Sequence, residues 1–219
     1  SESVVAEGPW AGSTLSELIG RFGAELLGKA NYARFGQEFP LLVKFIDARE
    51  DLSIQVHPDD ELARKRHGKS GKCEMWYVLE AEPGASLLTG FSRPIAPAEY
   101  ERRVADNTLT DVLNRQAIAS GDVFYLPAGR VHSIGKGSFI VEIQQSSDIT
   151  YRIYDFDRRD AAGNSRELHT ELAREAIDFE SSENSRITYA PENNQEVRLV
   201  TTPYFTTSLY TPVSYTHLT

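Results

Sequence analysis

The feature that most constrains the fold is a series of short, strand-like segments that follows Pro40 and is divided by turn residues. Gly, Pro, Ser and Asp separate the segments, and these residue types end strands because they favour turns. The expected strands are residues 41–47, 52–57, 74–80, 86–91, 123–126, 138–144 and 150–156. So many short strands favour a sandwich or a small barrel, so we expect a mainly β fold.

Helical segments interrupt this pattern. Residues 14–17 have the sequence of a capping box, and apolar residues follow at helical spacing, so we expect a helix that ends at Gly28. Pro97 suits a first helical turn, and the apolar spacing after it predicts helical structure over 97–114. Shorter helices are expected at 58–66 and 168–177.

Composition limits the class of partner. The net charge of −9 argues against nucleic acid or an anionic membrane as the main partner. No apolar run approaches the ~20 residues that span a bilayer. The one cysteine, Cys73, excludes an intrachain disulfide and favours a reducing compartment. With no signal peptide visible, we expect a cytoplasmic protein.

The segment from Gly121 to His132 places a histidine after a sharp turn. A strand follows Gly121, Pro127 and Gly129 form the turn, and His132 stands where the chain enters the next strand. Such a turn aims His132 back across the mouth of a barrel. The spacing Gly-x5-Pro-x-Gly-x2-His resembles the second motif of the cupin superfamily at every fixed position. It therefore predicts a cupin-type jelly-roll barrel with short helical insertions.

Two pairs of polar residues accompany His132. Residues two apart on a strand point to the same side, so Gln55 and His57 can reach one ion, and Lys72 and Glu74 repeat that geometry. The set offers two imidazoles and a carboxylate, with the Gln55 amide oxygen as a further candidate ligand. It suits Zn²⁺ with one position left open, and Fe²⁺, Mn²⁺ or Co²⁺ would also fit.

Each of these residues, taken alone, also has a structural interpretation. Gln55 and His57 can form a polar strand face, Lys72 and Glu74 an ion pair, and His132 a turn cap. The joint arrangement favours a metal site, because the candidate ligands belong to the strands of one barrel.

The other histidines and the cysteine are interpreted as structural. His67 ends a basic helix, and His169 is expected to pack or to cap the helix that follows it. His217 lies in the terminal segment. Cys73 alternates away from its neighbours and is expected to lie inert in the core.

Four stretches of the chain resemble class I mannose-6-phosphate isomerases in their short bacterial form. They are residues 39–60, 72–77, 127–132 and 147–158. The resemblance runs from about Val4 to Phe179. It implies a zinc-dependent aldose-ketose isomerase that interconverts mannose 6-phosphate and fructose 6-phosphate through a cis-enediol. The implied partner is a small phosphorylated sugar.

The resemblance also implies roles for individual residues. Arg152 matches the arginine assigned as catalytic, and Lys72 and Glu142 match positions that line the site and are candidates for proton transfer. The zinc ligands, one ion per chain, are matched by Gln55, His57, Glu74 and His132.

Ser53 and Arg158 are candidates for contact with the sugar phosphate. From the residues alone, both would be exposed polar side chains. Arg152 would form a salt bridge with Asp155 or Asp157.

We expect a cupin catalytic domain over 1–180 that includes the helical insertions at about 14–28 and 97–114. A linker is expected at 181–195 and the start of a second cupin-like domain at 196–219, of which 213–219 is interpreted as a foreign tail or a misread end. The family normally has a further N-terminal segment and a complete second domain, so we expect a fragment truncated at both ends.

Two other functions use the same barrel. One is a metal-dependent cupin oxygenase, which would consume O₂. The other is a non-catalytic sugar-binding cupin, which ligand would stabilise without any product being formed.

Overall fold

The computed structural model describes residues 3–180 and 184–213 and divides into two compact units, Ser1–Leu41 and Leu42–Thr219. Of the described helices, none combines the length and the apolar character needed to cross a membrane.

The first unit is built from short helices, whose bounds are α1 (Leu15–Phe22), α2 (Ala24–Leu27) and α3 (Lys29–Phe35). The expected capping box is present: Thr14 Oγ1 accepts from the Glu17 amide, and the Glu17 carboxylate accepts from the Thr14 amide. The single helix expected to end at Gly28 is interrupted at Gly23. Gly23 has φ +50°, and a Cβ there would lie 3.3 Å from the Tyr32 ring, so a glycine ends α1 and lets the chain turn.

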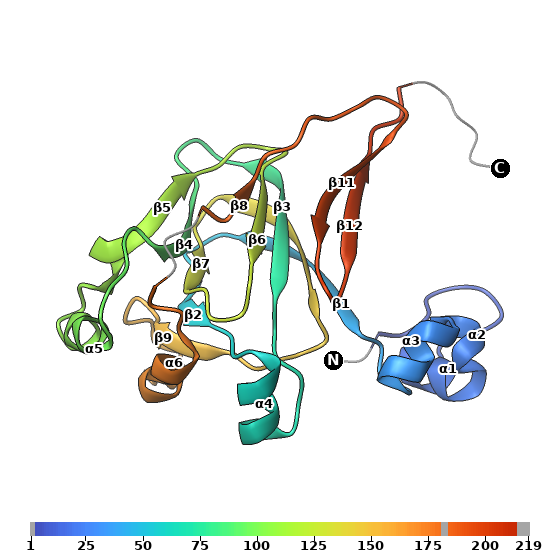
Figure 1. Cartoon of the computed structure of the whole chain (residues 1–219), viewed down its shortest axis with the longest axis horizontal. Coiled ribbons are helices and arrows are strands. Elements are labelled where there is room, and N and C mark those ends of the chain that lie inside the picture. The colour runs from blue at the N-terminus through green and yellow to red at the C-terminus, as the bar shows by residue number, and fades with distance from the viewer. Residues whose placement is uncertain (1–2, 181–183, 214–219) are drawn as a thin grey trace. The chain divides into compact units, whose positions relative to one another are not determined.

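The second unit holds two five-stranded sheets (Figure 1). In spatial order the first sheet contains β1 (Leu41–Ala48), β8 (Ser138–Gln145), β3 (Glu74–Ala81), β6 (Val123–Leu126) and β10 (Arg186–Ile187). The second contains β5 (Leu113–Ala117), β4 (Ser86–Phe91), β7 (His132–Ile134), β2 (Ile54–Val56) and β9 (Tyr151–Tyr154). Strand β3 runs antiparallel to both of its neighbours, as does β2.

An apolar core fills the space between the two sheets. Trp76 and Phe124 from the first sheet are buried together with Leu87 and Ile134 from the second. Burial of large side chains from both sheets supplies the main free energy that holds them face to face. The structure confirms the expected mainly β fold with short helical insertions.

Helices cover the outer face of the second sheet. They are α5 (Pro97–Ala105), the 3₁₀ helix η1 (Leu109–Val112) and α6 (Thr170–Ala176). The expectation of helix throughout 97–114 is wrong at its end, because Leu113 begins strand β5. Leu113 pairs with Phe91 of β4, so hydrogen bonding at the sheet edge replaces the last helical turn.

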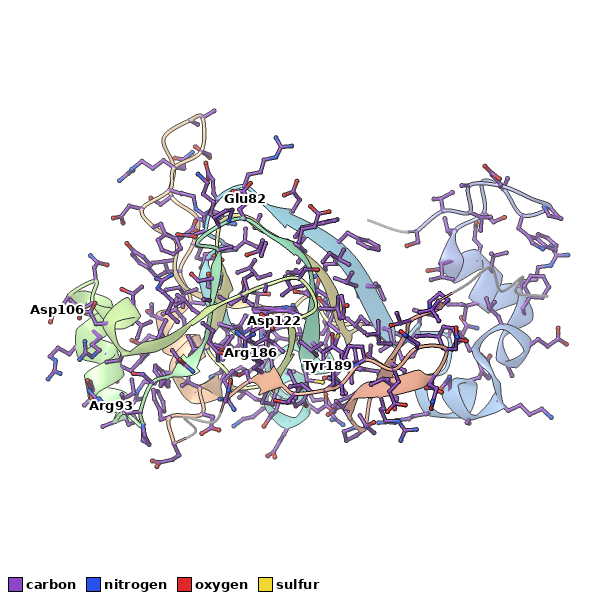
Figure 2. All side chains as sticks on the ribbon, turned by 90° about the horizontal axis from the view of Figure 1, so that it is seen from above. Glu82, Arg93, Asp106, Asp122, Arg186 and Tyr189 are labelled. Atoms are coloured by element: carbon purple, nitrogen blue, oxygen red, sulfur yellow. The ribbon has the colours of Figure 1, made fainter. Side chains whose placement is uncertain are left out.

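Strand β10 extends the first sheet beyond β6. Arg186 forms an ion pair with Asp122 in the turn before β6 (Figure 2), and the Tyr189 hydroxyl donates to the Gly121 carbonyl at 2.6 Å. Part of the segment expected to be a linker is thus a strand of this sheet. Residues 181–183 of that segment lie outside the described residues.

A separate two-stranded sheet follows, made of β11 (Glu196–Thr201) and β12 (Thr206–Tyr210). Leu199 of β11 and Phe205, directly before β12, are buried. The Tyr204 hydroxyl, in the turn between the strands, donates to Asp60 Oδ2 at 2.8 Å. That this sheet begins a second domain remains a prediction. Residues 214–219, with His217, lie outside the described part of the chain.

Candidate metal centre and substrate site

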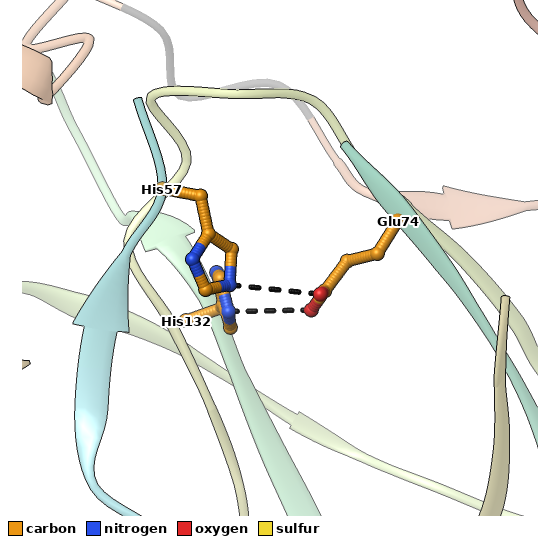
Figure 3. Close-up of side chains that lie close together, drawn as sticks. All are labelled: His57, Glu74 and His132. Carbon is orange, nitrogen blue, oxygen red and sulfur yellow. Dashed lines mark ion pairs between the residues drawn. The ribbon is translucent and has the colours of Figure 1, made fainter. Parts of the chain in front are cut away.

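The structure brings two imidazoles and a carboxylate together between the sheets (Figure 3). His57 follows β2, Glu74 begins β3 and His132 begins β7, and each is at most 2% exposed. His57 Nε2 lies 3.5 Å from Glu74 Oε2, and His132 Nε2 lies 3.3 Å from Glu74 Oε1. One candidate ligand atom from each residue lies within 4.8 Å of the others. We call these three residues the ligand group.

Main-chain carbonyls fix the orientation of both imidazoles. His57 Nδ1 lies 2.9 Å from the Ile149 carbonyl, and His132 Nδ1 lies 2.8 Å from the Arg130 carbonyl. A carbonyl oxygen can only accept, so each Nδ1 carries the proton and each neutral ring has its lone pair on Nε2. Both Nε2 atoms face Glu74. Metal-binding histidines are held in this way, through the nitrogen that does not bind the ion.

The electrostatics favour the metal-binding protonation states. Burial, with the positive charge of Lys72, lowers the pKa of His57 to about 4, and burial also lowers the pKa of His132. Burial alone would raise the pKa of Glu74, but Lys72 and the two imidazoles outweigh it and hold that pKa well below its usual range. At neutral pH the group therefore offers two neutral imidazoles and one carboxylate, the forms that bind metal.

The ligand group also contains unsatisfied polar atoms. Among the described residues, His57 Nε2 and both Glu74 oxygens are buried without a hydrogen bond of normal geometry. Lys72 Nζ forms an ion pair with Glu74 Oε2 at 2.9 Å. The Nε2 atoms of the two imidazoles still face the Glu74 carboxylate. Buried polar atoms rarely lack partners, and a cation shared by the three side chains would satisfy them. The group can therefore hold a metal ion.

Gln55 lies beside the ligand group on β2. Its Cα pairs with His132 on β7 and with Arg152 on β9, so the three residues form one row across the second sheet. The Gln55 amide nitrogen lies 3.4 Å from His132 Nε2. A half-turn of the amide would present its oxygen instead. This position is compatible with a fourth ligand, which remains a prediction.

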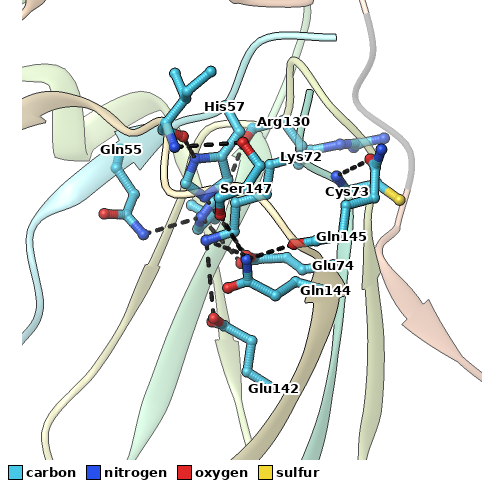
Figure 4. Close-up of polar contacts among 12 residues, drawn as sticks. Gln55, His57, Lys72, Cys73, Glu74, Arg130, Glu142, Gln144, Gln145 and Ser147 are labelled. Carbon is cyan, nitrogen blue, oxygen red and sulfur yellow. Dashed lines mark hydrogen bonds and ion pairs between the residues drawn. The ribbon is translucent and has the colours of Figure 1, made fainter. Parts of the chain in front are cut away.

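Lys72 and Glu142 lie on the first-sheet side of the ligand group (Figure 4). Lys72 is buried, and its Nζ lies 2.9 Å from Glu74 and 3.8 Å from Glu142. Glu142 accepts hydrogen bonds from Lys44 Nζ at 2.8 Å and from Trp76 Nε1 at 3.2 Å. Lys72 therefore contacts Glu74 of the ligand group directly, whereas Glu142 lies beyond Lys72 and contacts that lysine.

Sequence reasoning missed Lys44. It stands in the otherwise apolar start of β1, and its Nζ also donates to Gln144 Oε1 at 2.6 Å. A single lysine in an apolar strand is a usable signal of an ion pair, and the Lys44 side chain, which is 40% exposed, pairs with the buried Glu142. The strand alone does not indicate which carboxylate is the partner.

A hydrogen-bonded turn holds the loop that carries Lys72. Asp60 accepts from the Gly71 amide at 2.8 Å, from the Gln145 amide group at 3.2 Å and from Tyr204. The Cys73 amide donates to Gln145 Oε1 at 2.8 Å. A Cβ on Gly71 would lie 2.4 Å from the Asp59 carbonyl carbon, so the loop can approach α4 (Asp60–His67) this closely only with glycine.

Cys73 is buried, as expected. Burial raises the pKa of its thiol to about 12. The thiol therefore stays protonated and unreactive.

Arg152 projects from β9 at the other side of Gln55. Its Nη1 donates to the Glu167 carbonyl at 2.9 Å. Burial lowers the pKa of Arg152, and the nearby charge of Arg166 lowers it further. The salt bridge to Asp155 or Asp157 expected from the residues alone is not formed among the described residues.

Asp155 instead pairs with Arg158 and Arg166. Arg158 Nη2 lies 2.5 Å from Asp155 Oδ1, and Arg166 binds both carboxylate oxygens. Burial alone would raise the pKa of Asp155, but the two arginines outweigh it and hold that pKa below its usual range. We call Arg152, Arg158 and Arg166 the arginine cluster.

The two predicted phosphate contacts lie in different surroundings. Ser53 is buried directly before β2 and forms no side-chain hydrogen bond with the described site residues. Arg158 is held by Asp155, with Glu50 3.9 Å away. Their roles toward a phosphate remain predictions.

Comparison with known proteins identifies the relatives of this chain. Residues 1–91 match the family model described as phosphomannose isomerase type I, catalytic domain. The mannose-6-phosphate isomerase of Streptococcus mutans is 38% identical over 93% of this chain and 63% of its own length. Mannose-6-phosphate isomerase ManA of Bacillus subtilis is 41% identical over 82% of this chain and 56% of its own length.

A solved structure agrees with these sequence matches. The crystal structure of the mannose 6-phosphate isomerase from Bacillus subtilis has a TM-score of 0.84 and 35% identity, covering 94% of this chain and 64% of that one. This chain thus spans less than two thirds of the length of these relatives. None of these matches favours the oxygenase or the sugar-binding alternative.

Proposed function

We propose that this chain, which belongs to the type I phosphomannose isomerase family, interconverts mannose 6-phosphate and fructose 6-phosphate. The observation that carries the proposal is the buried ligand group, flanked by Lys72 on one side and by Arg152 on the other. An aldose-ketose isomerisation needs a proton carrier and a positive environment for the developing enediolate, and these two side chains supply both.

The proposed ion is Zn²⁺, one per chain, held by His57, Glu74 and His132 with Gln55 as a fourth ligand. Nitrogen and oxygen donors in this number suit Zn²⁺, and Mn²⁺, Co²⁺ or Fe²⁺ would also fit. When bound, the ion would orient the sugar oxygens and polarise the carbonyl.

The chain must also move a proton. It leaves C2 of mannose 6-phosphate and is returned at C1 through the cis-enediol. Lys72 is the better placed carrier, because its Nζ lies beside the ligand group, whereas Lys44 and Trp76 already occupy the oxygens of Glu142. Glu142, 3.8 Å from Lys72, would orient that amine or accept its proton.

The arginine cluster supplies the positive charge. Arg152 is in register with Gln55, so its guanidinium can stabilise the negative charge that develops on the enediol oxygens. Arg158 and Ser53 would bind the phosphate. Because a phosphorylated sugar does not cross membranes unaided, we expect the enzyme to act in the cytoplasm.

The test is a coupled assay. The Zn²⁺-loaded chain is supplied with mannose 6-phosphate, and fructose 6-phosphate formation is followed with and without a chelator, beside a full-length relative. Chelator-sensitive turnover supports the proposal. Stabilisation by the sugar phosphate without product would identify a binding protein, and O₂ consumption without isomerisation would identify an oxygenase.

A further inference from the structure

Strand β9 is an edge strand, and His169 binds its main chain at Arg152. The Arg152 amide donates to His169 Nδ1 at 3.2 Å, and the His169 amide donates to the Arg152 carbonyl at 2.7 Å. Both main-chain polar groups of Arg152 are therefore satisfied by one residue outside the sheet. An edge strand would otherwise leave such groups to water.

The same segment also binds the guanidinium. The Glu167 carbonyl, two residues before His169, accepts from Arg152 Nη1 at 2.9 Å. Residues 167–169 thus hold Arg152 at the main chain and at the end of the side chain. Two fixed points restrict the rotamers of a long side chain far more than one does.

The contact requires one protonation state of His169. The Arg152 amide can only donate, so His169 Nδ1 must be unprotonated and the ring proton must lie on Nε2. Glu167 Oε2 lies 3.9 Å from that Nε2, on the side where a proton is required. The ring is 24% exposed and lies against Tyr151, with 6.4 Å between the ring centroids.

We infer that His169 is a positioning residue for Arg152, which keeps the guanidinium directed at the substrate through the hydrogen bond from the Arg152 amide to Nδ1. The inference rests on the proposed function, in which Arg152 stabilises the enediolate. It gives a role in catalysis to a histidine that the sequence indicates only as a packing or capping residue. No side-chain hydrogen bond caps α6 at His169, which leaves Nδ1 to Arg152.

His67 provides a matched control within the chain. It contacts Tyr151 as His169 does, with its Nε2 2.8 Å from the hydroxyl. Its described hydrogen bonds do not include Arg152. A loss of packing around Tyr151 should follow either substitution, but only His169 should affect Arg152.

The experiment compares His169→Leu, His169→Asn and His169→Gln in the zinc-loaded chain. Asn Oδ1 is separated from Cα by the same number of bonds as His Nδ1, whereas the Gln oxygen lies one bond further out. His169→Leu and His169→Gln should lower kcat by about 10- to 100-fold with little change in KM or zinc content, as expected for a misplaced catalytic group. His169→Asn should recover most of kcat, and His67→Leu should have the same kcat as the unaltered chain.

Two further measurements decide between positioning and general stability. In an Arg152→Ala background, His169→Leu should cost no additional kcat, because the residue it positions is gone. The Arg152 amide should exchange with solvent faster in His169→Leu than in His169→Asn. A full additional loss in the Arg152→Ala background, or equal kcat in the Leu and Asn variants, would overturn the inference.

The amide-exchange measurement separates this inference from the proposed function. If the unaltered chain shows no turnover, the proposed isomerase activity fails, and exchange at Arg152 still reports whether His169 holds it. Equal exchange rates in the Leu and Asn variants would then overturn the inference by themselves.

Discussion

The ligand group and the arginine cluster meet in one row of the second sheet, through His132 and Arg152, but the two groups are held in opposite ways. Gln55 lies between them, in register with His132 on one side and with Arg152 on the other. The ligand group is almost fully buried at strand ends, and main-chain carbonyls fix its imidazoles. The arginine cluster lies around an edge strand, and loop residues hold it.

The ligand group therefore depends on the barrel, whereas the arginine cluster depends on the loops around it. The barrel fixes the ligand group, so that part should hold an ion even when the loops change. The arginines depend on Asp155 and on residues 167–169, so they should control turnover and substrate affinity without affecting metal content. Variants at Glu74, Arg152 and Arg158 test that separation.

The largest effect is expected at the ligand group. Glu74→Gln keeps the shape of the side chain but removes the only charge that the group offers to a cation. Loss of a residue that only supports a metal ligand lowers metal affinity by ~10- to 100-fold, so loss of this ligand charge should lower zinc affinity by more than that. His132→Ala should do the same, and Gln55→Ala should be milder, since water can replace an amide oxygen. Metal content after gel filtration measures this. Glu80→Gln, at an exposed position on the same strand, is the control. Zinc at the original stoichiometry in Glu74→Gln would show that the ion binds elsewhere.

The second effect concerns Arg152 and leaves the metal in place. Arg152→Ala should lower kcat by ~10²–10³-fold, because the lost contact is strongest in the transition state. Arg152→Lys should recover little, since an ammonium cannot reproduce the planar two-pronged contact. Steady-state kinetics measure the change in kcat, and zinc analysis measures whether the metal content is unchanged. A change in KM alone would make Arg152 a phosphate anchor and would move the catalytic role to Lys72 or Glu142.

A smaller effect is expected at Arg158. Its loss should raise KM for the phosphorylated sugar by about 10-fold, the equivalent of a charged hydrogen bond of roughly 1.5 kcal/mol, with kcat nearly intact. Asp155 keeps its two-point contact with Arg166, so the fold should tolerate the change. Arg159→Ala, in the exposed loop that follows, is the control. Equal KM values in the two variants would remove Arg158 from the substrate site.

The smallest effect is the pH dependence of stability at Asp155. Its pKa is lower in the folded chain than the ~3.9 of an unfolded aspartate, so the carboxylate stabilises the fold above that pH. The contribution is lost as the pH falls from about 4 through the lowered folded pKa. Melting temperatures below pH 5 should therefore fall less steeply in Asp155→Asn than in the unaltered chain. Asp157→Asn, at an exposed position, should follow the unaltered chain.

The same division explains what the sequence could and could not predict. Strand alternation and the turn before His132 are local features, and they predict that His57, Glu74 and His132 converge. The structure brings these three side chains together. The partner of Arg152 is a carbonyl at Glu167, and the partners of Asp155 are Arg158 and Arg166. Such partners depend on where a loop returns, and no periodicity encodes that.

Two helical predictions failed for related reasons. Gly23 ends α1 because its positive φ stops the helix, although the apolar spacing continues across it. Leu113 leaves the helical segment because the edge of β4 offers hydrogen bonds that a helix end lacks. In both places a competing local or tertiary interaction overrides the pattern.

Trp76 gives the barrel interior an optical readout. It is fully buried, its ring centroid lies 5.4 Å from that of His132 in a T-shaped arrangement, and its Nε1 donates to Glu142. The chain has two tryptophans, and the other, Trp10, is 38% exposed in the helical unit. Their emission should therefore separate into a short-wavelength band from Trp76 and a longer one from Trp10. With Trp10→Phe the remaining fluorescence comes from beside the ligand group, and titration with Co²⁺ should quench it in step with occupancy.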